Sequence, residues 1–481
     1  MSTSAPRPAI VWFRRDLRLA ENPALARAIA SGRPIIPVFV LETSPAVRPI
    51  GAASRWWLDK SLRALEAELC SLGSRLILRR GDAGAVIQRL AAEAGAGAIF
   101  WNRLYDAPEI ARDTQLKAVL RAEGVEVQSS NAALLNEPWE VKTGSGGDYQ
   151  VFGAYWRAAR ARIGSVDYGP APDQLIGPDA WPESDDLAVW RLHPRAPDWS
   201  GGFSDWSPGE AGAQAALERF LNTGLSGYGR TRDIPSREGV SRLSPHLHWG
   251  EIGPRQIWRA VQTRAYANPD IEPDAEKFLT ELGWREFNCH LGFHRTGLAT
   301  QDVRATFQGL VWRKDPEAFA AWSHGQTGYP IVDAGMRQLW ATGWMHNRVR
   351  MIVASFLVKD LLIDWREGEA WFWDTLVDAD SASNAGNWQW VAGCGADAAP
   401  FFRIFNPTLQ GERFDPDGVY IRRWVPELRR LQNALVHKPW AATADQLTAA
   451  GLRLGQDYPP PIVDHGEARA RALEVYHSLR P

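Results

Sequence analysis

The sequence is short of cysteine, of long apolar runs and of excess basic charge. Three cysteines in 481 residues, Cys70, Cys289 and Cys394, are too few and too far apart for a disulfide framework or a metal-binding motif. This usage is typical of a reducing compartment, so we expect a cytoplasmic protein. No apolar run is long enough to span a membrane, and residues 1–8 lack the basic and apolar regions of a secretory signal.

The charges nearly cancel, with 54 Lys and Arg against 56 Asp and Glu. Nucleic-acid-binding proteins are often basic overall, so a nucleic-acid site on this chain would be a local basic patch. The G-x-G-x-x-G and G-x-x-x-x-G-K-[ST] motifs do not follow the predicted strands, which argues against a plain nucleotide-binding α/β protein. Tryptophan, in contrast, is abundant at 24 residues. Most of these indoles are expected in the core, and others to stack on a ligand or carry electrons.

Hydrophobic periodicity predicts an α/β domain with a doubly wound parallel sheet over residues 1–135, a linker over 136–210 and an all-helical domain over 211–481. Buried strands are predicted at 9–13, 34–41, 75–79, 98–101 and 125–128, with helices between them at 23–30, 54–72, 83–94 and 108–123. The linker is rich in Gly, Pro and Asp, has a helical piece near 155–163, and is long enough that we expect it to pack on the body. Further helices are predicted at 212–222, 254–266, 273–291, 316–324, 333–342, 344–362 and 367–377.

Two of the predicted helices carry polar faces that are unlike core stripes. On the helix over 273–291, the i, i+3, i+4 and i+7 positions hold Glu281, Trp284, Arg285 and Asn288. On the helix over 344–362, one face holds Trp344, Asn347, Arg348 and Met351, while Arg350 points elsewhere. An indole beside a carboxylate, an amide and a guanidinium indicates a pocket wall for a base; the alternative is a solvated face with a stray tryptophan.

Two further segments indicate ligand contacts. DADSASNAGNWQW (378–390) is expected to be a helix end that turns into a tight loop, where Gly386 lets backbone approach a ligand. SRLSPHLHWGEIGPRQ (241–256) places hydroxyls and an arginine before a helix start, which suits a phosphate but also suits a simple N-cap. The histidine pairs 246/248 and 290/294 lack a further ligand at metal spacing, so we expect no metal site.

Together these segments resemble the photolyase/cryptochrome family. VWFRRDLRL (11–19), LGWREF, TGYPIVDAGMRQLWATGWMHNRVRM, SFLVKDLLIDWREGE and NWQWVAGCGADAAPFFRIFNP are similar to long family signatures. The likeness is to microbial cyclobutane pyrimidine dimer photolyases, with features of the class III subgroup. It implies an α/β domain, a helical domain that binds FAD, and light-dependent repair of UV-damaged DNA by a monomer. A cryptochrome photoreceptor is the alternative, although such a protein usually carries an extension after the helical domain.

The resemblance also implies roles for particular residues. FAD would be bound by Tyr228, Ser241, Arg242, Leu243, Ser244, Trp284, Arg285, Asn347, Arg350, Asp378, Asp380 and Asn384. Within this set Arg350 would pair with Asp378, and Asn384 would face flavin N5, where animal cryptochromes tend to have Cys and plant cryptochromes Asp. Val240 stands where many members have a hydroxyl residue. Asn347, where the (6-4) enzymes have a second His, favours the cyclobutane dimer as the lesion.

The remaining roles concern the lesion, electron transfer and an antenna. The flipped-out dimer and its flanking phosphates would be bound by Glu281, Trp284, Asn347, Arg348, Met351, Trp390, Arg232 and Arg403. Electrons would reach the flavin through Trp388, Trp365 and Trp312. The antenna is expected to be methenyltetrahydrofolate, at a site that includes Glu42, Trp57 and Glu109, although Pro108 replaces an amide residue of the folate-type motif.

Overall fold

The computed structural model describes residues 6–479, so most of the segment examined for a secretory signal lies outside the described range. Its first half contains a parallel five-stranded sheet in the order β3-β2-β1-β4-β5. The strands are β1 Ala9–Phe13, β2 Ile35–Glu42, β3 Ile77–Gly81, β4 Ala98–Asn102 and β5 Glu126–Ser130. The predicted α/β class is therefore confirmed, with strand limits shifted by one or two residues.

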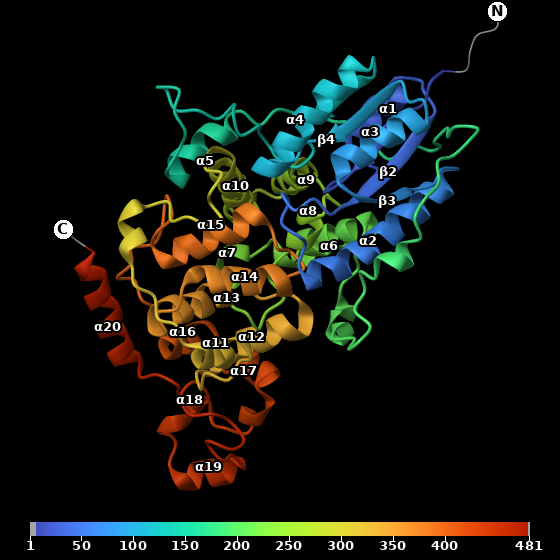
Figure 1. Ribbon diagram of the computed structural model, residues 1–481. Coiled ribbons are helices and arrows are strands. Elements are labelled where there is room, and N and C mark those ends of the chain that lie inside the picture. The colour runs from blue at the N-terminus through green and yellow to red at the C-terminus, as the bar shows by residue number, and fades with distance from the viewer. Residues whose placement is uncertain (1–5, 480–481) are drawn as a thin grey trace, which may run out of the picture.

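The strands are apolar on both faces because helices cover the sheet on both sides, as Figure 1 shows. These helices are α1 Pro23–Ala30, α2 Ala52–Ser71, α3 Ala83–Glu93 and α4 Ala107–Ala122. Along β1, Val11 and Phe13 pack with α1 and α2, whereas Ile10 and Trp12 pack with α3 and α4. The alternation follows from the two-residue period of a strand.

The segment between the two halves packs on the body, as its length required. It contains α5 Phe152–Arg160 and the short 3₁₀ helices Leu187–Trp190 and Ser200–Asp205. Trp190, Phe203 and Trp206 are buried in the same core as α1 and α2. This segment therefore adds to the core beneath the sheet.

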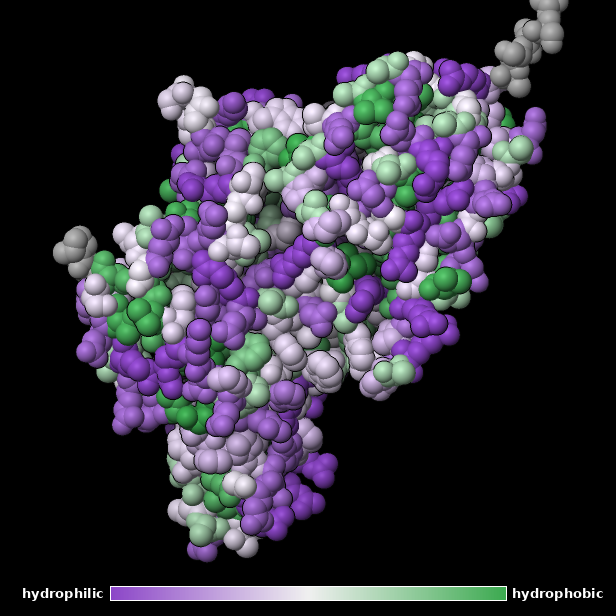
Figure 2. Space-filling view, viewed as in Figure 1, coloured by the Kyte–Doolittle hydropathy of each residue, from purple (hydrophilic) through white to green (hydrophobic). Residues whose placement is uncertain are grey.

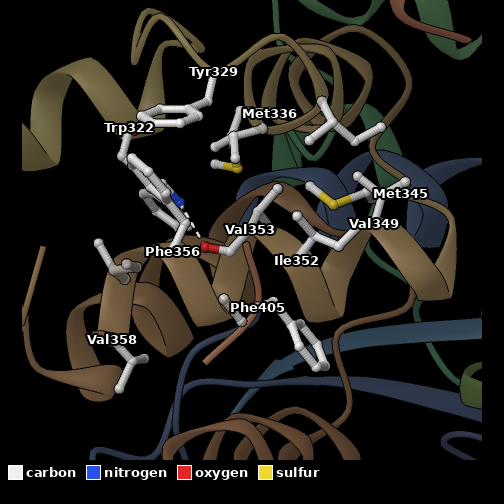
Figure 3. Close-up of a cluster of buried hydrophobic side chains, with 14 of the residues drawn as sticks. Trp322, Tyr329, Met336, Met345, Val349, Ile352, Val353, Phe356, Val358 and Phe405 are labelled. Atoms are coloured by element: carbon white, nitrogen blue, oxygen red, sulfur yellow. Dashed lines mark hydrogen bonds between the residues drawn. The ribbon is translucent and has the colours of Figure 1, made fainter. Parts of the chain in front are cut away.

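The second half is helical, as predicted. Its helices are α6 Glu210–Arg219, α7 Tyr228–Thr231, α8 Ser244–His248, α9 Pro254–Ala267, α10 Glu272–His294, α11 Pro316–Ser323, α12 Pro330–Thr342, α13 Asn347–Ser355, α14 Trp365–Thr375, α15 Ser381–Ala392, α16 Pro407–Phe414, α17 Val419–Trp424, α18 Asn433–Val436, α19 Ala444–Ala450 and α20 His465–Ser478. Figure 3 shows part of its core, where Trp322 donates from Nε1 to the carbonyl of Val353 at 3.0 Å.

Figure 2 shows polar and apolar residues interspersed on the outer face in view. No helix among residues 6–479 is long and apolar enough to cross a membrane.

Two sequence predictions about helix limits were wrong. Residues 378–390 do not turn into a loop: α15 begins at Ser381, because the Asp380 carboxylate accepts from the N–H of Ser383 at 2.8 Å and caps the helix. Gly386 lies inside this helix. The predicted helix over 344–362 begins only at Asn347, which leaves Trp344 before it, and its last turn, Phe356–Asp360, is a π-helix.

The two halves meet where α2 begins beside the end of α14. Trp373 donates from Nε1 to the carbonyl of Pro49 at 2.8 Å, and the N–H of Ala52 donates to Asp374 Oδ1 at 2.9 Å. A Cβ on Gly51 would lie 2.0 Å from the carbonyl oxygen of Trp373. Only glycine permits this approach, which brings the segment after β2 next to α14.

Candidate active site

Polar side chains from α8, from α13 and from the segment before α15 meet at Asp378. Ser244, at the start of α8, donates from Oγ to Asp378 Oδ2 at 2.6 Å. Arg350 of α13 donates to both oxygens of Asp378, at 3.2 and 2.9 Å. The expected Arg350–Asp378 pair is therefore present. It orients a buried carboxylate beside the loop over 241–244.

One helical turn into α15, Asn384 is held by a residue that the sequence did not indicate. Both amide hydrogens of Asn384 go to Glu369 of α14, to Oε1 at 2.8 Å and to the backbone carbonyl at 3.0 Å. Glu369 in turn accepts two hydrogen bonds from Arg48, at 2.8 and 3.0 Å. Arg48 follows β2 and lies over the ring of Trp373 at 4.1 Å. With its N–H groups used, Asn384 has its oxygen Oδ1 left to accept from a ligand.

A cavity opens between the two halves beside Asp380. Arg285 and Asp380 line it from the helical half, and Arg15, Tyr105 and Asp106 line it from the α/β half. Burial acts to raise the pKa of the Asp380 carboxyl, but neighbouring His248 and Arg285 outweigh it and the pKa lies below its ordinary value. Asp380 is therefore ionised at neutral pH.

The predicted phosphate loop holds one correction. The guanidinium of Arg242 does not face the loop: it lies 4.0 Å from the ring centroid of Trp206 and 5.4 Å from that of Trp344. Arg242 itself has a φ of 55°, a left-handed conformation that turns the chain before Leu243 and Ser244. Tyr228 is buried between Phe220 and Phe278. For an anionic ligand this loop offers backbone N–H groups and the Ser241 hydroxyl, because the Ser244 hydroxyl donates to Asp378 and the guanidinium of Arg242 lies between two indoles.

The indole of Trp284 on α10 is supported from one side. Phe152, at the start of α5, stacks on it with ring centroids 3.8 Å apart and an interplanar angle of 8°. A ligand can therefore stack only on the opposite face. Phe152 was missed because it lies in the predicted linker, 132 positions before Trp284 in the sequence.

Almost one turn before Trp284, Glu281 is hydrogen-bonded to Arg232. Arg232 also lies near Asp233 at 3.7 Å, and its side chain is only 12% exposed. Arg232 is thus paired with two carboxylates, and its contact with a DNA phosphate stays a prediction. Arg348 pairs with Asp233 at 2.8 Å and lies over Phe414, whereas the side chain of Arg403 is exposed.

The other residues predicted around the lesion lie at the start of α13 and along α15. Asn347 is exposed as the first residue of α13. Met351 and Trp390 are partly buried against the core of the helical half. The structure therefore leaves these three side chains partly accessible, and it adds Phe402, which is 59% exposed beside Arg403.

Two of the three tryptophans of the expected electron path are fully buried, and the third is partly accessible. Trp388 and Trp365 are 2% and 0% exposed, and Trp312 is partly buried. Trp388 packs directly on Gly368 of α14: a Cβ at Gly368 would lie 2.2 Å from the indole ring. Trp365, three residues before Gly368, donates from Nε1 to Asp302 at 2.8 Å. The Nε1 of Trp388 is buried with no hydrogen-bond partner in the structure.

The expected antenna residues do not come together. Glu42 pairs with Arg112 at 2.9 Å, and Glu109 with Arg15 at 3.1 Å, both near the carboxyl ends of the strands. Trp57 is 0% exposed and donates from Nε1 to Glu251 at 2.9 Å. Its rings are enclosed by Trp56, Trp206 and His246. Trp57 as a stacking surface for folate is therefore wrong: it is a core residue that joins α2 to α8.

Comparison with known proteins accounts for this arrangement. Residues 9–173 match the family model described as DNA photolyase, and residues 278–478 match the FAD binding domain of DNA photolyase. Over 98% of both chains, the sequence is 51% identical to the deoxyribodipyrimidine photo-lyase of Agrobacterium fabrum. This chain belongs to the photolyase/cryptochrome family.

Two further relatives of the family bear on the fold and on the alternative function. The crystal structure of a bacterial class III photolyase from Agrobacterium tumefaciens superposes with a TM-score of 0.95, at 51% identity, over 100% of this chain and 99% of that one. Cryptochrome-1 of Arabidopsis thaliana is 42% identical over 98% of this chain and 70% of its own length. The family and the fold predicted from the sequence are confirmed.

The family's FAD suits the groups that this site offers. The Ser241 hydroxyl and backbone N–H groups at 241–244 suit phosphates. The carboxylates of Asp378 and Asp380 suit ribose hydroxyls or ring N–H groups, and the Asn384 oxygen suits a donor. Arg48 and Glu369, which fix that oxygen, were not found from the sequence. Glu369 lies within the family signature SFLVKDLLIDWREGE, but no sequence spacing relates it to Arg48.

Proposed function

We propose that the protein is a deoxyribodipyrimidine photolyase, which repairs cyclobutane pyrimidine dimers in DNA under light. The observation that carries this proposal is the shared wall formed by α10. Its Glu281 and Trp284 lie on one face of the helix, and one turn after Trp284 Asn288 packs against α15, where a Cβ on Gly386 would lie 2.4 Å from Asn288 Oδ1. A lesion beside the middle of α10 and a flavin at α15 would thus be neighbours.

In this proposal the lesion pocket receives the flipped-out dimer, stacks on it, forms hydrogen bonds with it and binds the flanking phosphates. The dimer leaves the duplex at a cost of about a few kcal/mol, which is least for a damaged base. Trp284, with Phe152 behind it, and Trp390 stack on the dimer, each contact contributing about 1–3 kcal/mol. Glu281 accepts hydrogen bonds from the dimer, while Asn347 and Met351 complete the wall. Arg348 and Arg403 bind the flanking phosphates.

When bound, reduced FAD would supply, on excitation by light, the electron that splits the dimer and that returns to the flavin afterwards. Tyr228, Ser241, Leu243, Ser244 and the backbone of Arg242 would hold its phosphates. Asp378 with Arg350, Asp380 and Arg285 would bind its ribose and ring edge. Asn384 would present Oδ1 to N5, an acceptor that favours a protonated nitrogen and therefore the reduced flavin.

Two accessory roles complete the proposal. Trp388, Trp365 and Trp312, in this order outward, would carry electrons to the oxidised flavin. A methenyltetrahydrofolate antenna would bind near Glu109 and Glu42 at the carboxyl edge of the sheet, without Trp57. We place the protein in the cytoplasm, where its three free cysteines remain reduced, and expect a monomer.

The likeness to Cryptochrome-1 of Arabidopsis thaliana makes a blue-light photoreceptor the second candidate. The deciding experiment illuminates the purified protein with a dimer-containing oligonucleotide and follows the recovery of undamaged thymines. A photolyase restores the DNA with many turnovers, whereas a photoreceptor does not. Glu281→Ala should lower the repair yield at least several-fold, and Glu276→Ala on the same helix, whose carboxylate pairs with Arg160, should not. No dimer splitting by the wild type would refute the proposal.

A further inference from the structure

The last turn of α10 carries two histidines that face an aspartate from a distant segment. His290 and His294 are four residues apart, so both lie on one face of the helix. Asp148 comes from the loop before α5. One nitrogen of each imidazole and one carboxylate oxygen all lie within 4.8 Å of one another. We propose that Asp148, His290 and His294 form a binding site for a divalent transition-metal ion such as Zn²⁺.

The hydrogen bonds of the two rings leave lone pairs for such an ion. His290 Nδ1 and His294 Nε2 each lie 3.2 Å from the carbonyl oxygen of Pro138, which can only accept. Both nitrogens therefore carry hydrogen, and in the neutral rings the opposite nitrogens are bare. His294 Nδ1 then faces Asp148 Oδ1 at 3.3 Å. Two electron-rich atoms at that distance need a cation between them, either a proton on the ring or a metal ion.

The surroundings of His290 favour a metal ion over a proton as the cation between His294 and Asp148. Its side chain is 1% exposed, and its Nε2 is buried with no hydrogen-bond partner in the structure. Because Nδ1 donates its hydrogen to the Pro138 carbonyl, Nε2 of the neutral ring carries no hydrogen and offers a lone pair. A proton shared by His294 and Asp148 would leave that atom unsatisfied. A metal ion that takes a nitrogen from each ring uses the donors of both.

The donor set indicates the class of ion. Two imidazoles and one carboxylate suit Zn²⁺, Co²⁺ or Ni²⁺, whereas Ca²⁺ and Mg²⁺ prefer oxygen ligands alone. Metal–donor bonds of about 2.0–2.2 Å require the three groups to approach by roughly an ångström. Asp148 can make that movement, because it lies in a loop and its side chain is 36% exposed. Water would fill the fourth position.

The site would connect two parts of the lesion pocket. Asp148 lies four residues before Phe152, which stacks on Trp284, and the histidines lie on the same helix as Trp284. A bound ion would fasten the loop before α5 to α10 and so stiffen that stacked pair. The histidine pair alone did not indicate this site, because its third ligand is 142 positions away from His290 in the sequence.

The experiment titrates full-length, FAD-loaded protein, first stripped with chelator, with CoCl₂ and then ZnCl₂. We expect one Co²⁺ per chain, with a visible absorption band that Zn²⁺ abolishes, and a rise in Tm on Zn²⁺ addition. His294→Ala and Asp148→Asn should each weaken binding at least ten-fold. His324→Ala removes an exposed histidine elsewhere and should bind as the wild type does.

Several results would overturn the proposal. These are absence of the Co²⁺ band in folded wild-type protein, more than one equivalent bound without saturation, or equal binding by the wild type and His294→Ala. The FAD spectrum of each variant reports folding, so a variant that fails to fold is replaced by His294→Gln. The readout needs neither light nor DNA, so its outcome is independent of whether the protein repairs dimers.

Discussion

At the scale of single residues, the structure gives Arg232 a carboxylate partner that the sequence did not indicate. Arg232 is largely buried and hydrogen-bonded to Glu281, so its effect on DNA should pass through the carboxylate. Arg232→Ala should weaken binding of dimer-containing DNA about ten-fold, or about 1.4 kcal/mol, and change binding of undamaged DNA much less. Fluorescence anisotropy over a range of salt concentrations measures both affinities.

If Arg232 instead contacted a DNA phosphate, the variant would not distinguish damaged from undamaged DNA. A phosphate contact predicts equal losses of affinity for damaged and undamaged DNA and a decrease of about 1 in the slope of log K against log salt. Arg230→Ala, which removes an exposed charge two residues away, is the matched control for overall charge. Equal losses with a reduced salt slope would return Arg232 to the phosphate role.

The residue types of the site were predictable, but their partners were not. The family signatures contain Asp378, Asn384 and Glu281, because the chemistry of a ligand limits which side chains can bind it. The groups that orient them lie far away in sequence, as Phe152 and Arg48 do. Such pairings depend on how elements pack, which local spacing does not record.

At the scale of elements, all five strands and most helices up to α14 followed from periodicity, whereas helices α16 to α20 were not predicted individually and residues 344–362 and 378–390 were assigned wrong limits. The Asn and Gly content of 378–390 indicated a loop, but packing against α10 and α14 keeps this segment helical. Trp344 fits the period of α13 and yet lies outside it, because the chain is capped two residues later by His346. Propensity is a weak guide wherever tertiary contacts decide.

The cap of α13 should make stability depend on pH. His346 Nδ1 accepts from the N–H of Arg348 at 3.2 Å, so the cap requires a neutral ring. Burial lowers the pKa of His346 to about 4, below the value near 6.5 of an unfolded histidine. The unfolded chain therefore binds a proton first, and the free energy of unfolding decreases as pH falls from 6.5 towards 4. From pH 7 to pH 5 the loss from this group is about 2 kcal/mol.

His346→Asn tests this dependence, since Asn can cap the helix and does not titrate. Urea unfolding at pH 7 and pH 5 should show a smaller loss of stability in the variant than in the wild type, by about 2 kcal/mol. His290, whose pKa is also lowered to about 4, contributes equally to both proteins. His324→Asn, at an exposed position, should leave the difference between the two pH values unchanged. An unchanged difference in His346→Asn would contradict the role of the cap.

At the scale of the whole molecule, the α/β half and the helical half both contribute residues to the candidate site. Arg48 and Glu369 join the segment after β2 to the residue expected at flavin N5, and the cavity beside Asp380 is lined from both halves. The sequence predicted two architectures but not this junction. Nothing in either half alone specifies how closely α2 approaches α14, because that distance is set by one glycine and by contacts between residues more than 300 positions apart.

Gly51→Ala should therefore lower the free energy of unfolding and weaken FAD binding. The φ of Gly51 is −67°, so alanine is not strained by its own backbone, and the penalty comes from its Cβ, which would lie 2.0 Å from the Trp373 carbonyl oxygen and 2.7 Å from Asp374 Cα. Overpacking of this kind costs about 1–3 kcal/mol. Thermal unfolding should show a Tm several degrees lower and release of FAD at a lower temperature, because Arg48 is displaced from Glu369. Gly164→Ala, which meets nothing within 4 Å, should change neither. If Gly51→Ala unfolds and releases FAD as the wild type does, the junction between α2 and α14 does not support the flavin site.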